Sequence, residues 1–315
     1  MKQILKYLKR CASVMVVLMV LAILPVKAEA ANYQLVNVSI GQNGVKTKVG
    51  SYYFWSQWKE GKGNQLFASK SATAKTGTLL ATPKQSDSSG SILTNGVKVY
   101  YVNDDSLKKH TLYEVGVNGK NRKKDAVISG REMYLVNYYN DQIYYNVPTS
   151  NGYTLSSYSV KTKKTKTLVK NVFPVSLTGG DRYICMDSVT NSKITVQIYD
   201  CKLSKVIKKH TIKKSSSENA ILLWLTQKYV YCPVYSEKAT KIYRCAINGS
   251  GSIKLFTKLG EGYDFGTVDN NYIYYSISKE NKDGDFITTY YRMKLTNKKA
   301  SKITEKTYNK VMGWV

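Results

Sequence analysis

A short motif of apolar and aromatic residues recurs six times along this 315-residue chain. Each copy is Tyr-Tyr or a close variant after a turn, centred on Tyr53, Tyr100, Tyr144, Ile184, Tyr231 and Tyr274. The centres lie 40 to 47 positions apart, a mean period of about 44, and periods of this size are the sign of a repeat architecture. Each repeat is then expected to form one supersecondary unit.

A second motif follows each copy of the first after 12 to 17 residues. Its aromatic residues are Phe67, Tyr113, Tyr158, Tyr199, Tyr243 and Tyr291. Tyrosine and β-branched residues favour a pleated, half-buried surface. The two motifs therefore predict two neighbouring antiparallel strands in every repeat.

Each repeat has room for two further strands. An apolar segment such as residues 133–136 precedes the first motif, and a segment such as residues 166–169 follows the second. Asn118-Gly119 and Asn248-Gly249 stand where the last hairpin turns, and Asn-Gly favours a type I′ turn. No sustained helical period is found after residue 30.

Four short antiparallel strands every 44 residues or so describe a β-propeller blade. We therefore predict an all-β fold, a single six-bladed β-propeller over residues 31–315, with seven blades as the lesser alternative. The tail, residues 311–315, resembles the first strand of another repeat. We expect it to pair with the first blade and close the ring, which would remove exposed sheet edges.

Residues 1–30 are predicted to be a secretory signal peptide. Lys2, Lys6, Lys9 and Arg10 precede an apolar run over residues 12–26, and the small-residue pattern at 28–30 predicts cleavage after Ala30. A retained membrane anchor is the alternative, but the run is short for a span. The expected location is outside the cell, in association with the envelope.

The chain carries 48 Lys+Arg against 21 Asp+Glu, a net charge of +27. Only six of the 48 are arginine, the residue that proteins favour for bidentate recognition. A lysine-rich exported protein suits diffuse attraction to anionic polymers. We expect no nucleic-acid partner, and a membrane surface only through electrostatics. An AT-rich genome would explain the lysines without function, but not the shortage of acids.

Lysines cluster after the second motif of several repeats, where the outermost strand and its turn are expected. Examples are Lys120, Lys123, Lys124, Lys161, Lys163, Lys164, Lys166, Lys205, Lys208, Lys209, Lys213, Lys214, Lys298, Lys299 and Lys302. Lysine on an edge strand prevents sheet-to-sheet association. The same lysines would also give the molecule a cationic circumference.

The repeated turn followed by Ile/Val-Tyr-Tyr, and then by Leu/Ile-Tyr, resembles the Tyr-Tyr-repeat propellers of secreted Gram-positive bacterial proteins. That family is a domain of unknown function, related in shape to the low-density-lipoprotein-receptor-type and TolB-like six-bladed propellers. The resemblance covers about residues 45 to 310 and implies architecture, with no activity to carry over. Repeats four and five depart from it, with cysteine where other repeats have tyrosine or an aliphatic residue.

Four cysteines lie beyond residue 30, an even number in an exported protein. Cys185 and Cys232 end first-motif strands, and Cys201 and Cys245 end second-motif strands. We predict the disulfides Cys185–Cys201 and Cys232–Cys245, each within one blade. Free buried thiols are the alternative. No metal site is predicted, since Cys-x-x-Cys is absent and the two histidines are not spaced as ligands.

The candidate ligand-binding residues are Trp55, Trp58, Lys59, Asp104 and Asp105, on segments that join the second strand of a blade to the third. Loops of this kind border the central channel of a propeller. Trp58 is either exposed, where its ring would stack on a sugar, or packed under its own loop. The acidic segments at residues 103–105 and 281–285 are interpreted as turns.

No catalytic residue and no cofactor is predicted. Acids such as Asp141, Asp181 and Asp269 stand in turns before first-motif strands, where Asp favours turn conformations. His110 and His210 each follow Lys-Lys and are expected at solvated strand ends. We expect a non-catalytic binding module for an anionic cell-wall polymer, a glycan or a protein. The alternative is a carbohydrate-active hydrolase or lyase that uses the mouth of the channel. The sequence indicates no oligomeric state.

Overall fold

The computed structural model describes residues 33–38, 46–83, 91–106, 108–175, 181–220 and 222–312. The predicted signal peptide lies outside these ranges. The described part of the chain is built from strands and one helix, α2 (Glu305–Met312), which confirms the all-β prediction. None of its helices has the length and apolar character needed to cross a bilayer.

Hydrogen bonding joins the described strands into five sheets. The first contains β2 (Thr47–Val49), β3 (Tyr52–Lys59), β4 (Gly63–Ser69) and β5 (Thr78–Ala81). The second contains β1 (Gln34–Asn37), β6 (Ser91–Thr94), β7 (Lys98–Ser106), β8 (Lys109–Gly116) and β9 (Lys123–Ser129). The third contains β10 (Tyr134–Tyr139), β11 (Gln142–Thr149), β12 (Gly152–Ser159), β13 (Thr165–Val175), β14 (Tyr183–Val189), β15 (Lys193–Asp200) and β16 (Lys205–Lys213).

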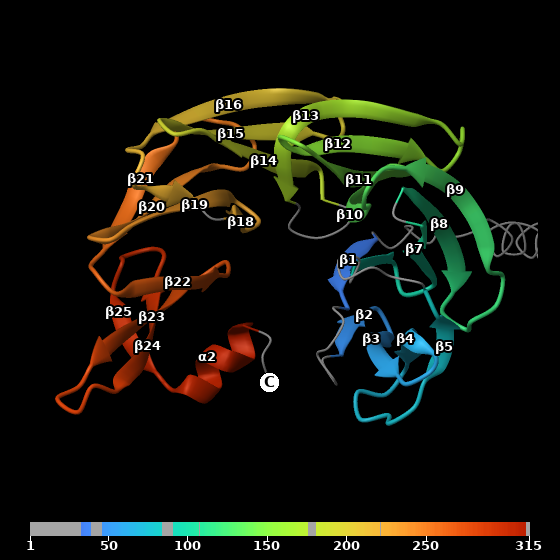
Figure 1. Ribbon diagram of the computed structural model, residues 1–315, viewed down its shortest axis with the longest axis horizontal. Coiled ribbons are helices and arrows are strands. Elements are labelled where there is room, and N and C mark those ends of the chain that lie inside the picture. The colour runs from blue at the N-terminus through green and yellow to red at the C-terminus, as the bar shows by residue number, and fades with distance from the viewer. Residues whose placement is uncertain are drawn as a thin grey trace, which may run out of the picture. The chain divides into compact units, whose positions relative to one another are not determined.

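The last two sheets complete the series. The fourth contains β17 (Asn219–Ala220), β18 (Trp224–Leu225), β19 (Tyr229–Ser236), β20 (Ala239–Ala246) and β21 (Lys254–Leu259). The fifth contains β22 (Tyr263–Val268), β23 (Tyr272–Glu280), β24 (Phe286–Lys294) and β25 (Ala300–Ile303). Figure 1 shows successive sheets in a propeller arrangement.

The two sequence motifs form neighbouring antiparallel strands, as predicted. The first motif lies in β3, β7, β11, β14, β19 and β23, and the second in β4, β8, β12, β15, β20 and β24. Tyr101 stands opposite Tyr113, and Tyr275 opposite Tyr291. The rings of each pair stack, with centroids 5.5 and 5.4 Å apart. Such cross-strand pairs stabilise a sheet.

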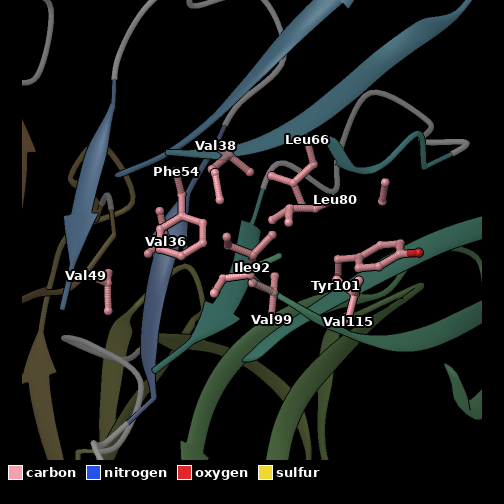
Figure 2. Close-up of a cluster of buried hydrophobic side chains, with 13 residues drawn as sticks. Val36, Val38, Val49, Phe54, Leu66, Leu80, Ile92, Val99, Tyr101 and Val115 are labelled. Carbon is pink, nitrogen blue, oxygen red and sulfur yellow. The ribbon is translucent and has the colours of Figure 1, made fainter. Parts of the chain in front are cut away.

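The hydrophobic core consists of clusters between the faces of successive groups of strands. Figure 2 shows the cluster between the first two sheets, where Phe54 and Leu66 of the first meet Ile92, Val99 and Tyr101 of the second. Further clusters fill the corresponding spaces along the chain as far as the fifth sheet. This face-to-face packing explains why the first-motif strands are apolar on both sides.

The count of six separate four-stranded blades is not confirmed, because the third sheet has seven strands. Its strand β13 is 11 residues long. The first part of β13 pairs with β12, and residues 173–175 pair with β14. One strand thus serves both as the last strand of one repeat and as the first strand of the next.

The hairpin turns are only partly as predicted. The turn between β10 and β11 has positive φ at both Asn140 and Asp141, as a type I′ turn requires. At Asn118-Gly119 and Asn248-Gly249 only the glycine has positive φ. The amide of Gly119 donates to the carbonyl of Gly116 at 2.9 Å. These are type I turns followed by a glycine in the left-handed region, which adds a bulge that the dipeptide alone does not reveal.

The C-terminal tail does not form the predicted ring-closing strand. Val311 and Met312 belong to helix α2, and residues 313–315 lie outside the described ranges. Thr304 begins the helix, since its hydroxyl accepts from the amide of Thr307 at 3.2 Å. Tyr308 is buried against the fifth sheet, with its ring centroid 4.7 Å from that of Tyr290. The Thr304 cap and the burial of Tyr308 stabilise a helix here, although the sequence of the tail resembles that of a strand.

The four described cysteines are free and buried, which contradicts both predicted disulfides. Cys185 stands opposite Ile198, and it faces a different core cluster from Cys201. Cys232 stands opposite Tyr243, so Cys245 is its diagonal neighbour. Diagonal neighbours are about 7–8 Å apart, whereas disulfide Cβ atoms lie about 4 Å apart. Similar positions in the repeat therefore did not imply bonding distance between the sulfur atoms.

Ellman's reagent will test the state of these thiols. We expect the native protein, begun at residue 31 and kept free of reductant, to react slowly. Burial raises the pKa of Cys201 and of Cys245 to about 12, so both thiols are protonated at neutral pH. Four thiols per chain are expected after unfolding without reductant. Two or fewer reactive thiols per chain after unfolding would instead indicate that at least one disulfide is present.

Candidate functional site

An open hollow of about 510 Å³ lies on the first sheet, beside Trp55 and Trp58. Strand β3 supplies one wall, and the segment from Ala72 to Lys75, between β4 and β5, supplies the other. Trp58 is 62% exposed, so of the two alternatives for this side chain the structure shows the exposed one and not packing under its own loop. A ring with this exposure at the border of a hollow is available to stack on the apolar face of a sugar.

Trp55 forms part of the wall of this hollow. Its side chain is only 4% exposed and stacks on Phe67, with centroids 5.5 Å apart. The Nζ atom of Lys46 lies 4.7 Å above the Trp55 ring. Lys46 also donates to the carbonyls of Ala72, at 2.9 Å, and Ala74. Lys46 therefore connects the segment from Ala72 to Lys75 with strand β3, and the buried Trp55 ring packs as part of the wall of the hollow.

The predicted loop around the tryptophans is shorter than expected. Trp55, Trp58 and Lys59 all belong to strand β3, and the turn itself is residues 60–62, closed by Lys62 donating to the carbonyl of Lys59 at 3.0 Å. Lys59 is exposed but does not line the hollow. Which of these residues belong to the strand and which to the turn is visible only once the strand boundary is known.

Asp104 and Asp105 lie in strand β7 and not in a turn. The Asp104 carboxylate pairs with Nδ1 of His110, and Nε2 of His110 lies 3.0 Å from the carbonyl oxygen of Gly130. Thr111 donates to Asp105, which lowers the pKa of that carboxyl despite some burial. Both aspartates are thus held within the second sheet, and neither lines the Trp55 hollow.

The histidines are buried, contrary to the expected solvated strand ends. His110 is 1% exposed and His210 is 5% exposed. Burial, followed by the charge of Lys208, lowers the pKa of His210. Both lie where β8 and β16 pair with a neighbouring strand. Each histidine is flanked by polar residues, so the sequence suggested solvent exposure. In a strand, however, alternate side chains point to opposite faces, and the histidine ring points inward.

Of the two acidic segments, residues 281–285 form a turn and residues 103–105 belong to strand β7, whereas Asp269 stands in a turn as predicted. The Asp269 carboxylate accepts from the amides of Asn271 and Tyr272, each at 2.7 Å, and from the hydroxyl of Tyr274. Asn281 accepts from the amides of Asp283 and Asp285 in the turn before β24. No group of three or more His, Cys, Asp or Glu that could hold a metal ion occurs within the described ranges.

Sequence reasoning missed a second hollow, of about 520 Å³, around Arg244. It lies at the border of the core between the fourth and fifth sheets, next to Tyr229 and Phe256. The signal was the arginine that follows the second-motif tyrosine in repeats five and six, Arg244 and Arg292. In the other four repeats the residue at this position is neutral or acidic.

Comparisons with known proteins support the fold. An uncharacterized protein from Listeria monocytogenes EGD-e is 11% identical, with a TM-score of 0.53 over 87% of this chain and 83% of that one. The β-propeller domain of the Trilobed protease from Pyrococcus furiosus is 15% identical over 68% and 69%, with a TM-score of 0.46. A putative TolB from Agrobacterium tumefaciens is 10% identical over 87% and 98%, with a TM-score of 0.42.

These likenesses concern the architecture alone, because the identities are so low. No protein-family model matches the sequence, and no curated protein matches it. The sheet topology of the chain itself shows an all-β protein with antiparallel sheets in a propeller arrangement. TolB-like and protease-associated propellers are among the solved structures that it is similar to.

Proposed function

We propose that this protein is exported by its N-terminal signal peptide and acts as a non-catalytic β-propeller at the bacterial cell envelope. It binds an anionic polymer of the cell wall, in the manner of a rigid cationic platform. Its repeats correspond to six blades, two of which share strand β13. The observation that carries the proposal is a surface of lysines on the outer strands, most of which form no ion pair with a carboxylate within the described residues.

Strand β16 illustrates this surface. It forms one edge of the third sheet, and Lys205, Lys208, Lys209 and Lys213 are all exposed on it. None of these four forms an ion pair within the described residues. The prediction that lysine-rich segments form edge strands is confirmed here and at β9 and β25. Lysine on an edge strand prevents sheet-to-sheet association, and the four unpaired lysines of β16 also give this edge a positive charge that suits an anionic partner.

Several of the acids are occupied by ion pairs within the molecule. Glu114 is paired with Lys98 at 3.0 Å and with Lys123 at 3.4 Å, and it accepts from Tyr100 at 2.7 Å. Asp200 is held by Arg182. The full sequence has a net charge of +27, and most of this excess of bases lies beyond residue 30. The protein therefore has a positive field that attracts polyanions and raises their association rate.

Sedimentation with purified Gram-positive cell walls will test this function. We expect strong binding at about 50 mM salt and steep loss by about 500 mM, since the screening length falls from more than about 10 Å to less than about 5 Å. Walls stripped of phosphodiester polymers serve as the control and should bind weakly. Binding that ignores salt would contradict an electrostatic platform, and release of reducing sugar would instead favour the hydrolase alternative.

A further inference from the structure

The hollow around Arg244, here called the Arg244 pocket, is defined by Arg244, Lys254, Lys298, Tyr229 and Phe256. Its side chains come from β19, β20 and β21 of the fourth sheet, and from the turn after β24 of the fifth. The pocket thus draws on two repeats that are adjacent in the chain. A site of this kind exists only when both sheets are folded.

The pocket is cationic and has no compensating acid. Among its described lining residues are Arg244, Lys254 and Lys298, but no Asp or Glu. None of the three cations forms an ion pair within the described part of the chain. Three positive charges around one hollow repel one another, and an anion between them would relieve that repulsion.

Aromatic rings hold Arg244 in place. Its guanidinium carbon lies 4.2 Å from the ring centroid of Tyr229 and 4.4 Å from that of Phe256. Lys298 also lies over Phe256, with Nζ 5.0 Å from the centroid. Cation–π contacts of this kind fix the side chain while its planar N–H fork remains able to donate. The entropy lost on binding an anion is correspondingly smaller.

Arg182 provides a comparison, because its guanidinium group already binds a carboxylate of the same chain. It lies 5.2 Å from the Tyr183 ring, and its Nε donates to both oxygens of Asp200 at 3.0 Å. The chain supplies the carboxylate at that position. At Arg244 no carboxylate of the described residues forms an ion pair, and the described side-chain partner is the neutral Tyr231 hydroxyl, so the charge of the guanidinium is open to an external anion.

A related cationic hollow occurs two repeats earlier. A space of about 380 Å³ at the border between β12–β13 and the β15–β16 turn is lined by Lys164, Lys166 and Lys202, again without a described Asp or Glu. It occupies the same place in its repeats as the Arg244 pocket does in repeats five and six. Repetition of one cationic feature along the outer strands suits a ligand that is itself a repeating polyanion.

We propose that the Arg244 pocket binds a phosphate group of a phosphodiester-linked polymer. This inference rests on the proposed function and names the ligand class of one site. Arg244 supplies the bidentate fork, and Lys254 and Lys298 neutralise the remaining charge. The hydroxyls of Ser250, Ser252 and Thr296, which also line the pocket, can donate to further oxygens. A tetrahedral anion uses this dispersed set of donors better than a planar carboxylate.

The first test observes the arginine Nε–H signals by NMR while glycerol 3-phosphate is added. A chain begun at residue 31 has only five arginines, so the signals are few. We expect the Arg244 signal to shift with saturation, and the signal of the exposed Arg131 to stay nearly unchanged. An Arg244 shift no larger than that of Arg131 overturns the proposal. Acetate at equal ionic strength separates phosphate from carboxylate, and a stronger response to acetate also overturns it.

The second test measures the affinity for poly(glycerol phosphate) in matched variants. Arg244→Gln is expected to weaken binding by about tenfold or more, the loss typical of a hydrogen-bonded charge. Arg131→Gln removes the same charge outside the pocket and should change the affinity by less than about twofold. Lys298→Gln, in the pocket, is compared in the same way with Lys282→Gln, outside it. Both lysines are exposed, so neither substitution is expected to disturb folding.

The two proposals fail in different ways. If cell walls bind wild-type protein but Arg244→Gln and Lys298→Gln bind as tightly as their controls, the pocket is wrong and the platform stands. If the wild type does not bind walls but the Arg244 signal responds selectively to phosphate, the pocket stands and the envelope function is wrong.

Discussion

Replacing Asp187 by Asn is expected to stabilise the folded protein by about 2 to 3 kcal/mol at pH 8 and by much less near pH 4. Asp187 lies in β14 and is 5% exposed. Its Oδ1 atom has no hydrogen-bond partner within the described residues. Burial raises the pKa of this carboxyl to about 6. Ionised Asp187 is therefore a cost to the fold that Asn avoids at nearly the same volume.

The pH window follows from the direction of this shift. A carboxyl whose folded pKa is raised is most favourable when protonated, below its unfolded pKa of about 4. As the pH rises from about 4 to about 6, the wild type loses this stability, and above about 6 the loss is complete. Asn does not titrate, so the variant should show no such loss.

His210 and Cys232 are the titratable neighbours that share this environment. Val196 stands opposite both Asp187 and His210 in the sheet, and the pKa of Cys232 is raised mainly by burial and then by Asp187. His210 also has a buried ring nitrogen, Nε2, without a described partner. Deviations from a single-site curve should thus appear where His210 titrates.

Urea unfolding at pH 4.5, 6 and 8 measures the effect as the free energy of unfolding. The control is Asp283→Asn, in the exposed turn before β24, which should leave stability within about 0.5 kcal/mol at every pH. A wild type more stable than Asp187→Asn at pH 8 would mean that the carboxylate has a stabilising partner.

Replacing Phe54 by Ala is expected to destabilise the protein by about 3 to 5 kcal/mol, the usual cost of emptying a buried phenyl site. Phe54 is fully buried, with 0% exposure, in the cluster between the first two sheets (Figure 2). Its removal leaves Val49 and Ile92 next to a void, because strands hydrogen-bonded on both sides cannot collapse to fill it.

Phe286→Ala provides a matched control, with the same atoms removed from a strand. Phe286 lies at the start of β24 and is 72% exposed. Its loss should cost less than about 0.5 kcal/mol. Thermal and urea unfolding of both variants give the comparison. Equal effects would show that the interface between the first two sheets does not contribute as its burial indicates.

Much of the fold was predictable from the sequence, because period and alternation are local properties. The aromatic ladders placed the second and third strands of every repeat, and Tyr101 and Tyr275 pair across those strands as the spacing implied. The helix at the C-terminus was not predictable from the same reasoning. Its eight residues owe their conformation to Thr304 and to the burial of Tyr308 on the fifth sheet.

The candidate site was predictable only in part. Trp58 is exposed and borders a hollow, but Asp104 and Asp105 bind within their own sheet and do not approach it. The Arg244 pocket was missed because it is shared by two repeats. Residues about 50 positions apart contribute to it, as Arg244 and Lys298 show, and no local pattern joins them.

The sequence by itself determined the repeating antiparallel strands, the positive charge and the location of lysines on the outer strands. These follow from side-chain periodicity and composition, which neighbouring residues carry among themselves. Only the tertiary structure decided that the cysteines are separate thiols, that β13 serves two repeats, and which cations share a pocket. Those features depend on strand register and on the packing of one sheet against the next, where a shift of one residue turns each side chain to the opposite face.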